Sequence, residues 1–415
     1  MKIRKISGGV TAARGFSAAH CAAGIKYQGR DDMAMIFSDQ PCHAVGTFTS
    51  NLVKAAPVLW DRGILAGGRP VQAVVVNAGI ANAATGQQGV DLCAATAEKA
   101  GQALNIPAKS VLLGSTGVIG PNLPLDKISA GIDLMAASLS DTVKAGTAAS
   151  KAIMTTDTVN KEYAVEFRLP AAEGKGSVPV RLGGMSKGSG MIHPNMSTML
   201  AYITTDCAIS PRLMRKALTT VVPDTFNMIS VDGDTSTNDT LLLLANGEAG
   251  NSEITEEDES YALFFEALMA VCRDLAIKMA GDGEGATHLI EMRVYGADTK
   301  SNAQKLARSV VSSSLVKAMV FGRDANCGRI LCALGYTGVY FDPSKIELYL
   351  DGPDERICFY QEGRVQEFDE KKALALLSGD AVRFSCDMKM GEAEATAWGC
   401  DLTYDYVKIN GDYRS

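Results

Sequence analysis

Thr198 is the residue whose position most suggests chemistry, because it stands between a turn and a predicted strand near the middle of the chain. A segment rich in Gly and Ser and a Pro-Asn turn precede it, and an apolar, β-rich run follows it. Because Pro-Asn is an ordinary turn dipeptide, one interpretation is that Thr198 only turns the chain into a buried strand. The other is that cleavage after Ser197 makes Thr198 a new N-terminus, whose hydroxyl is a nucleophile and whose amine is its base. The residues of this stretch leave both interpretations open.

Histidines and cysteines give weaker indications of chemistry. The four histidines are dispersed, and neither they nor the cysteines show the paired spacing of a zinc site, so we predict no metal. His193, five residues before Thr198, is a candidate base, but a histidine in a turn is more often structural. We therefore rank a catalytic role for His193 below a structural one.

Glycines mark three further segments where the backbone can approach a ligand. A predicted strand from residue 111 runs into Ser115-Thr116-Gly117, where glycine allows N–H groups to point into a site, although most such sequences are plain turns. The loop at residues 280–287 lacks the Gly-Lys-Ser/Thr ending of a phosphate-binding loop. The loop at Asp232 lacks the later Glu of an EF-hand, which excludes a calcium loop of that type.

The elements that must position these segments follow from the apolar spacing. Continuous or alternating apolar runs predict strands, and a spacing of three to four residues predicts amphipathic helices. The main predicted strands are residues 33–37, 44–49, 70–77, 162–169, 177–182, 288–295, 346–350 and 382–388. The main predicted helices are residues 89–104, 125–135, 140–154, 210–221, 261–279 and 299–316.

Length and composition indicate a globular protein. The 415 residues suffice for two domains, and 47% apolar with 21% charged residues is ordinary for a soluble chain. A net charge of −7 argues against nucleic acid or an anionic membrane as the main partner. No stretch approaches the roughly 20 apolar residues of a membrane-spanning helix, and no apolar segment follows the basic first residues, so we expect no secretory signal. The ten scattered cysteines are then expected to be reduced thiols in the cytoplasm.

The stretch Lys187-Gly-Ser-Gly-Met-Ile-His-Pro-Asn-Met-Ser-Thr-Met-Leu-Ala resembles the cleavage-site signature of the glutamate N-acetyltransferase (ornithine acetyltransferase) family of arginine biosynthesis. The resemblance covers essentially the whole chain. Its other specific pieces are Ser115-Thr-Gly-Val-Ile-Gly, the loop at Asp232, Asp282-Gly-Glu-Gly and the C-terminal tail. It implies a mixed α/β fold, a layered αββα-type sandwich of the N-terminal-nucleophile-like ornithine acetyltransferase/aminopeptidase kind. It also implies a catalytic domain at residues 1–287 and a smaller C-terminal α/β domain at 288–415.

The resemblance also implies an activity. A family member transfers the acetyl group of N2-acetyl-L-ornithine to L-glutamate through an acetyl-enzyme, with no metal or organic cofactor. Whether acetyl-CoA is also a donor stays open. The implied partners are these small molecules and the protein's own α and β chains, assembled as α2β2 in the cytoplasm.

Site residues are carried over from the resemblance onto matching positions. Thr198 is the nucleophile with its amine as base, Ser197/Thr198 is the cleavage site, and Thr116 and Gly117 form the oxyanion hole. The residues that would contact substrate are Thr155 (with Thr156 as the alternative alignment), Lys187, Thr198, Glu284, Asn410 and the last residue, Ser415.

Two positions depart from the family pattern. Ser197 stands where Ala is usual, and Cys327 stands where Trp is usual. Ser197 is also small, so we expect cleavage to persist, whereas Cys327 removes an aromatic surface from the local packing. Two other functions stay open: a self-processing Thr-nucleophile aminopeptidase or amidohydrolase, and a binding protein that is never cut.

Overall fold

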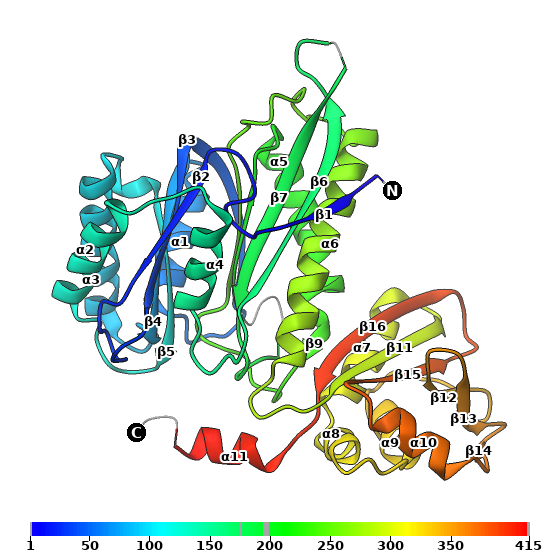
Figure 1. The fold of residues 1–415 in the computed structure, drawn as a ribbon. Coiled ribbons are helices and arrows are strands. Elements are labelled where there is room, and N and C mark those ends of the chain that lie inside the picture. Colours follow the sequence, from blue (N-terminus) through cyan, green and yellow to red (C-terminus); the bar gives the residue numbers. More distant parts are fainter. Residues whose placement is uncertain (1, 175, 194–198, 413–415) are drawn as a thin grey trace. The chain divides into compact units, whose positions relative to one another are not determined.

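The structure is a computed structural model that describes residues 2–174, 176–193 and 199–412 (Figure 1). The chain forms two compact units. Unit 1 consists of Met1–Gly188, Asn195–Phe226 and Thr235–Leu275, and unit 2 consists of Ser189–Pro194, Asn227–Asp234 and Ala276–Ser415. The described residues 189–193 therefore belong to unit 2, whereas those before 189 and those from 199 to 226 belong to unit 1.

The strands of unit 1 are joined through one long strand, β3 (Met33–Phe48). The strand order is β1-β6-β7-β8-β10-β3-β4-β5, and β2 also pairs with β3. The other strands are β1 (Arg4–Ile6), β2 (Phe16–Cys21), β4 (Val71–Ile80), β5 (Val111–Val118), β6 (Lys161–Pro170), β7 (Ser177–Lys187), β8 (Leu200–Thr205) and β10 (Thr240–Ala245).

β3 belongs to two sheets, one that it forms with β10 and its neighbours and one that it forms with β2 and β4. Its first part pairs with β2 and β4, its last part pairs with β10, and the register is irregular between Phe37 and Cys42. The sequence predicted two separate strands here, and that prediction was wrong. The six residues between them, Ser-Asp-Gln-Pro-Cys-His, interrupt the apolar pattern, but the backbone continues in a strand conformation through them.

Alternating side chains divide the core into two layers. Val74 and Val76 of β4 belong to a buried cluster that also contains Tyr202 of β8, so this cluster lies between the two sheets. Val75 belongs instead to a cluster with Ala97 and other helix residues on the outer face. The layers are thus helix, sheet, sheet and helix, which confirms the predicted mixed α/β, αββα-type fold.

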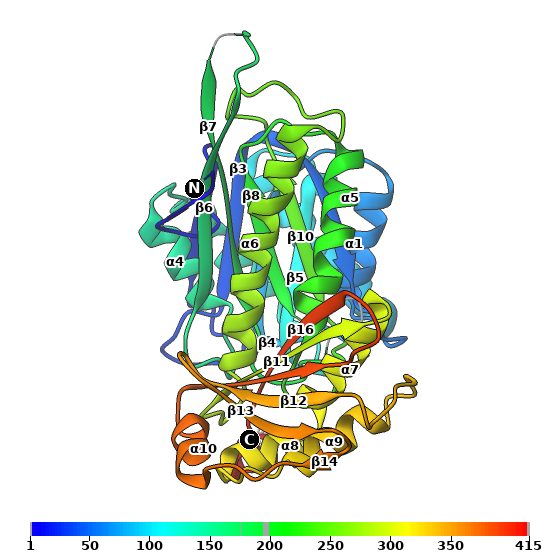
Figure 2. The same cartoon turned by 90° about the vertical axis from the view of Figure 1, so that its right-hand side faces the viewer.

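Among the described residues, six α-helices belong wholly or largely to unit 1. Helices α2 and α3 pack on the outer face of the sheet that contains β5, whereas α5 and α6 lie along β8 and β10 (Figures 1 and 2). The predicted apolar face of α5 is confirmed by the burial of Leu213, Ala217 and Val221. The helices are α1 (Ala56–Ala66), α2 (Gly86–Leu104), α3 (Leu125–Ala136), α4 (Val143–Ala152), α5 (Pro211–Val221) and α6 (Glu259–Gly281).

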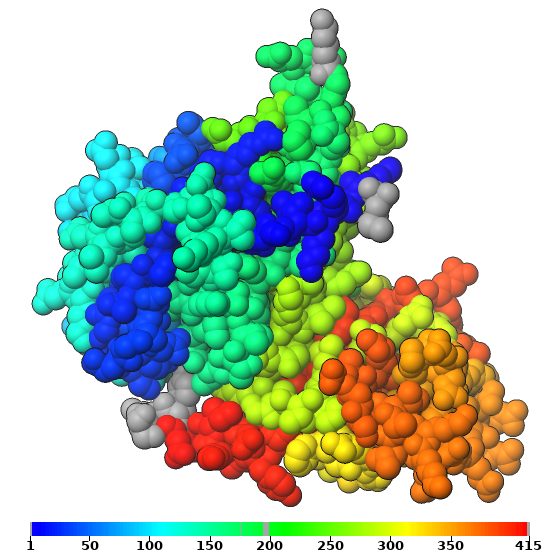
Figure 3. Space-filling view, viewed as in Figure 1, coloured from blue at the N-terminus to red at the C-terminus, as the bar shows by residue number. Residues whose placement is uncertain are grey.

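The β6–β7 hairpin carries one of the predicted site residues, Lys187, at the end of β7. The two strands pair antiparallel from Lys161↔Ser186 to Pro170↔Ser177, and the hairpin projects beyond the neighbouring strands of unit 1 (Figures 1 and 3). The predicted hairpin is therefore confirmed. β7 continues beyond its predicted end to Lys187, where it pairs with the start of β8.

Unit 2 is built on a seven-stranded sheet of order β14-β13-β12-β15-β11-β16-β9. Its strands are β9 (Ile229–Ser230), β11 (Leu289–Ala297), β12 (Glu347–Asp351), β13 (Arg356–Gln361), β14 (Arg364–Val365), β15 (Ala381–Asp387) and β16 (Ala393–Cys400). Its helices are α7 (Lys300–Ser312), α8 (Ser314–Phe321), α9 (Cys327–Gly335), α10 (Glu370–Leu377) and α11 (Tyr404–Gly411). Where it is described, the chain contains no helix with both the length and the apolar composition needed to cross a membrane.

The single helix predicted at residues 299–316 is instead two helices, α7 and α8. Ser313 has an extended backbone, with φ −72° and ψ 115°, and its side chain accepts a hydrogen bond from the backbone N–H of Val316. Serine favours such caps over helix interiors because its hydroxyl competes for backbone groups. Apolar spacing alone did not reveal this break.

Asp61 of α1 is a carboxyl group buried in unit 1. Its Oδ1 accepts a hydrogen bond of 2.8 Å from the N–H of Leu113, and its Oδ2 has no partner within the described part of the chain. Complete burial raises the pKa of Asp61 well above its ordinary value.

We expect the protein to lose stability as pH rises above about 4, because the unfolded carboxyl releases its proton there while the folded one keeps it. One such group contributes a loss of up to about 1.4 kcal/mol per pH unit. Asp61→Asn should flatten the dependence of the urea-unfolding free energy on pH, and the exposed control Asp141→Asn should not. Parallel curves for all three proteins would contradict this account.

Candidate active site

Lys187, at the end of β7, contacts two other predicted site residues. Its side chain is buried, and its Nζ donates hydrogen bonds to Thr155 Oγ1 at 2.8 Å and to Thr116 Oγ1 at 3.2 Å. Thr116 lies on β5 and Thr155 on the loop after α4, so three distant parts of the sequence meet within unit 1. The structure therefore brings together three of the residues that the resemblance assigned to the site.

A buried carboxylate supports this cluster. Asp157 Oδ1 accepts hydrogen bonds from Lys161 Nζ at 2.6 Å and from the N–H of Gly188 at 2.7 Å. Its Oδ2 accepts a hydrogen bond of 3.1 Å from the N–H of Thr155 and lies 3.8 Å from Lys187 Nζ. One carboxylate thus fixes the loop that carries Thr155 and the backbone that follows Lys187.

The charges of this network are set by their mutual contacts. Burial alone would raise the pKa of Asp157, but Lys187 and Lys161 outweigh burial and hold the pKa below its usual range. Asp157 is therefore ionised, and with both lysines charged, the three side chains carry one net positive charge. Lys161, the first residue of β6, is completely buried.

Sequence reasoning missed Asp157 and Lys161. The only trace in the sequence is that Asp157 precedes Lys161 by four positions, just before the strand predicted at residues 162–169. A turn and a strand do not place such residues side by side in any predictable way, so the spacing carried no structural meaning before the fold was known.

The threonine hydroxyls have a fixed role in this cluster. A hydroxyl has one hydrogen to donate and lone pairs to accept. Because Thr116 and Thr155 each accept from Lys187, each keeps its own hydrogen for another acceptor. The arrangement can therefore supply hydroxyl donors beside a cation, which suits an oxygen atom that gains negative charge.

Gly117 occupies a position that only glycine fits. Its φ is +129°, and a Cβ built there would lie 2.1 Å from the carbonyl carbon of Gly79 on β4. The pairing of the two strands is irregular at this point, because Ile80 faces both Thr116 and Val118. Such irregularities change the direction of nearby side chains and backbone groups.

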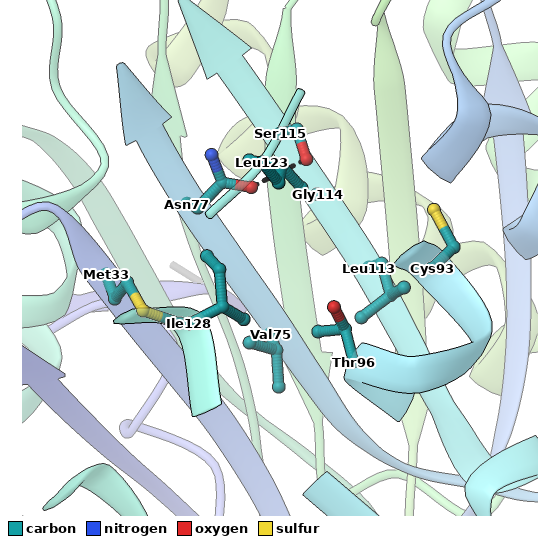
Figure 4. A pocket seen from close by; sticks show the side chains of 10 residues that line it. All are labelled: Met33, Val75, Asn77, Cys93, Thr96, Leu113, Gly114, Ser115, Leu123 and Ile128. Carbon is teal, nitrogen blue, oxygen red and sulfur yellow. Dashed lines mark hydrogen bonds between the residues drawn. The ribbon is translucent and has the colours of Figure 1, made fainter. Parts of the chain in front are cut away.

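A small cavity lies on the helix-covered side of β5 (Figure 4). It is lined by Asn77 and Ser115, whose Oγ donates to Asn77 Oδ1 at 2.7 Å, and by apolar residues of the sheet and of α2 and α3. Its volume of about 10 Å³ suffices for one water molecule but not for an amino acid. Because side chains alternate along a strand, Thr116 projects to the opposite face of β5 from Ser115.

Two further predicted residues meet in unit 2. Asn410 of α11 donates a hydrogen bond of 2.6 Å to Glu284 Oε2, and the Glu284 N–H donates to the carbonyl of Ser189 at 2.8 Å. Glu284 is buried. A Cβ on Gly190 would lie 2.4 Å from the Glu284 carboxyl carbon, so this glycine allows the two segments to approach.

Asp232 holds the segment that precedes the predicted cleavage site. Its carboxylate accepts hydrogen bonds from the N–H groups of Met191 at 2.6 Å and Ile192 at 3.0 Å, and from the hydroxyl of Tyr406 at 3.2 Å. Within the described ranges, no group of three or more His, Cys, Asp or Glu side chains is arranged to hold a metal ion. The hydrogen bonds of Asp232 therefore fix the backbone at Met191 and Ile192.

His193 lies beside hydroxyl groups. Its Nδ1 is 3.0 Å from Ser230 Oγ and 3.4 Å from Ser312 Oγ. Burial, and secondarily the charge of Arg308, lowers the pKa of His193 to about 4, so the ring is neutral at pH 7.

Cys327 is also in unit 2. It is buried at the start of α9, with its Sγ 3.9 Å from the carbonyl oxygen of Phe359. A small side chain thus occupies this buried position, where the resemblance implied Trp in other members.

Ser197, Thr198 and Ser415 lie outside the described residues. The clusters around Lys187 and Glu284 belong to different units, so each is defined separately.

Comparison with known proteins decides the family. Residues 17–415 match the family model described as "ArgJ family". The chain belongs to the ArgJ family. The resemblance seen in the sequence is thus confirmed, and the chain is a member of a family of arginine biosynthesis proteins.

Two curated members of the ArgJ family match nearly the whole chain. The arginine biosynthesis bifunctional protein ArgJ of Symbiobacterium thermophilum is 51% identical over 412 residues, which is 99% of each chain. The protein of the same name from Thermotoga neapolitana is 47% identical over 404 residues, which is 97% of this chain and 99% of its own.

Solved structures of the ArgJ family match about half of the chain. The Bacillus halodurans arginine biosynthesis bifunctional protein is 43% identical, with a TM-score of 0.49 over 51% of this chain and 97% of its own. The Mycobacterium tuberculosis ornithine acetyltransferase, solved with ornithine, is 42% identical, with a TM-score of 0.42 over 46% of this chain and 98% of its own.

Gly117→Ala should destabilise unit 1, because the clash with Gly79 involves backbone atoms that cannot rotate away. Gly120→Ala is the matched control, since Gly120 also has a positive φ, +110°, but a Cβ there would meet no atom within 4 Å. We expect a loss of about 1 kcal/mol from backbone strain in the control and at least about 3 kcal/mol in Gly117→Ala. Equal unfolding free energies for the two variants would show that the clash is relieved.

Lys161→Met should lower the unfolding free energy by about 3 kcal/mol, because it removes one partner of the buried Asp157. The exposed Lys151→Met should change it by less than about 0.5 kcal/mol. Adding Asp157→Asn to Lys161→Met should recover part of the loss, since the buried carboxylate that lost its close partner is then replaced by a neutral amide. A double variant as unstable as the sum of the two single variants would contradict the ionic account.

Proposed function

We propose that the protein transfers the acetyl group of N2-acetyl-L-ornithine to L-glutamate, giving L-ornithine and N-acetyl-L-glutamate. The main support is its membership of the ArgJ family over residues 17–415, together with the match to a relative named ornithine acetyltransferase. The cluster of Lys187, Thr116 and Thr155 adds physical support, because it places a cation beside two hydroxyl donors.

Maturation is proposed to create the nucleophile. Thr198 Oγ1 attacks the carbonyl carbon of Ser197, and the bond from that carbon to the Thr198 nitrogen breaks as the nitrogen gains a proton. The resulting ester is hydrolysed by water, which leaves the carboxyl group on Ser197 and a free hydroxyl and amine on Thr198. The products are an α chain of 197 residues and a β chain of 218 residues (415 − 197).

The free amine then acts as the base for acetyl transfer. An α-amine has an ordinary pKa of about 7.7–8.0, which is close to working pH. It accepts the proton of Thr198 Oγ1 as this oxygen attacks the acetyl carbonyl. The tetrahedral intermediate collapses to acetyl-Thr198 and ornithine, which leaves with a proton. In the second half-reaction the amine of glutamate attacks the acetyl carbon and gives up a proton. The bond from that carbon to Thr198 Oγ1 then breaks as this oxygen regains a proton, and N-acetyl-L-glutamate leaves.

The oxyanion of both half-reactions is assigned to Thr116 and Gly117. Lys187 occupies an acceptor position on Thr116, which leaves the hydroxyl hydrogen of Thr116 for the oxyanion. The net positive charge of Lys161, Asp157 and Lys187 favours a negative charge nearby, and burial strengthens this effect by excluding water. A donor of this kind typically contributes about 10²–10³ in rate.

Substrate binding is assigned to both clusters. Glu284 is the acidic group suited to an ammonium group of ornithine, and Asn410 positions its carboxylate through the hydrogen bond to Oε2. Thr155, Lys187 and the terminal Ser415 are the remaining proposed contacts. The assembly is proposed to contain two α and two β chains.

Thr198→Ala tests the proposal through chain cleavage and turnover together. Intact mass under denaturing conditions should show two fragments divided at Ser197/Thr198 in the wild type and one 43.8 kDa chain in the variant. Release of ornithine from acetylornithine with glutamate should fall by at least about 10³-fold. Thr198→Ser is the matched control, because it keeps a hydroxyl nucleophile and should still be cut.

Acceptor and donor specificity are tested with the cleaved protein. Acetylornithine consumption that requires glutamate supports the transferase, whereas equal consumption without glutamate indicates an aminopeptidase or amidohydrolase. Replacing acetylornithine by acetyl-CoA tests the second donor. Undiminished transfer by Thr198→Ala would overturn the mechanism.

A further inference from the structure

A second pocket in unit 2 is distinct from the contacts assigned above. Its volume is about 330 Å³, and it lies between one face of α7, the residues after α9 and His193. The residues that line it are His193, Lys305, Arg308, Ser309, Ser312, Tyr336 and Thr337.

The lining has the composition of a site for an anion. Lys305 and Arg308 are three residues apart on α7 and therefore share a face of the helix. The remaining lining side chains carry hydroxyl or imidazole groups, and no carboxylate from the described ranges lines the pocket. Two cations with surrounding hydroxyls match the recognition of phosphate-type oxyanions.

Arg308 is the strongest single indication. Its Nε and Nη2 are shielded from solvent and have no hydrogen-bond partner in the part of the chain that is described. Burial lowers the pKa of Arg308 to about 10, because the charged guanidinium loses hydration there. An oxyanion that enters the pocket can satisfy both nitrogens once the guanidinium turns toward it, and Nε with Nη2 is an edge that binds two oxygens at once.

The pKa of His193 should show whether an anion occupies the pocket. Its Nδ1 contacts Ser230 of β9 and Ser312 of α7, and Lys305 and Arg308 on α7 are the charged groups that line its pocket. Its low pKa arises from burial first and from Arg308 second. A bound anion would offset the charge of Arg308 and stabilise the protonated ring, so the pKa of His193 should rise when the pocket is filled.

We infer that the pocket formed by Lys305, Arg308 and the hydroxyls around His193 is a binding site for a phosphate-type oxyanion, either free or carried by a small molecule. One of its lining residues, His193, precedes Thr198 by five positions in the sequence, and the others lie on α7 and after α9. Binding of the anion does not depend on the proposed activity.

Titration of the full protein with inorganic phosphate, followed by calorimetry and by the NMR signals of the His193 ring, tests the site. We expect saturable binding and an upward shift of the His193 pKa from about 4. Arg308→Gln should weaken phosphate binding by about tenfold or more, and Lys305→Gln should weaken it by severalfold. The exposed Lys371→Gln on α10 is the charge-matched control and should leave the affinity within about twofold.

Glycerol 3-phosphate and sulfate distinguish the source of the anion. Tighter binding of glycerol 3-phosphate than of inorganic phosphate indicates a phosphate group on a small molecule, and the reverse order indicates the free ion. Amide NMR spectra show whether each variant folds; if Arg308→Gln does not, Lys305→Gln decides the test. Non-saturable binding, an unmoved His193 signal, or equal affinity in a folded Arg308→Gln and the Lys371→Gln control would overturn the inference.

Discussion

The buried contact between Lys161 and Asp157 is the interaction on which the Lys187 cluster depends. Asp157 fixes Thr155 and Gly188 through their backbone N–H groups and lies beside Lys187, so its position sets both the loop and the strand end. An isolated buried carboxylate would take up a proton and lose the strength of these bonds. Lys187 and the completely enclosed Lys161 together keep Asp157 charged, and Lys187 is at the same time engaged with two threonines.

Two lysines near one carboxylate can do what a single ion pair could not. Lys161 pairs closely with Asp157, and Lys187 donates hydrogen bonds to the threonine hydroxyls. A simple pair between Asp157 and Lys187 would neutralise the cation that we propose favours the oxyanion. Because Lys161 supplies the close 2.6 Å contact, Lys187 remains at 3.8 Å from the carboxylate and directs hydrogen bonds to the threonine hydroxyls instead. The excess positive charge is held by buried groups, where solvent screening is weak.

The sequence predicted those features that depend on local pattern. The continuous apolar run of β4 and the helical spacing in α5 were enough to predict these two elements, because burial acts on the whole of a covered strand and on every third to fourth residue of a helix. The layered αββα arrangement was predicted only through the family resemblance. The continuity of β3 through its irregular register was not predicted, because its pairing partners decide it. The break at Ser313 was not predicted either, because a single side-chain cap decides it. Thr116, Thr155 and Lys187 were named only through a family resemblance. The Asp157–Lys161 contact depends on the meeting of a loop and a strand start, which no local spacing encodes.

Strand order also bears on what a cut after Ser197 would do. β8 and β10 follow the cut, but β8 pairs with β7 and β10 pairs with β3, both of which precede it. β8 and β10 are themselves paired, so the two later strands lie inside a sheet whose flanking strands belong to the earlier chain. Separation of the fragments would break two complete ladders and expose Tyr202 and Leu242 of the core between the sheets. The fold therefore permits the loss of one peptide bond without the loss of the assembly, which is the condition that a self-generated N-terminal nucleophile must meet.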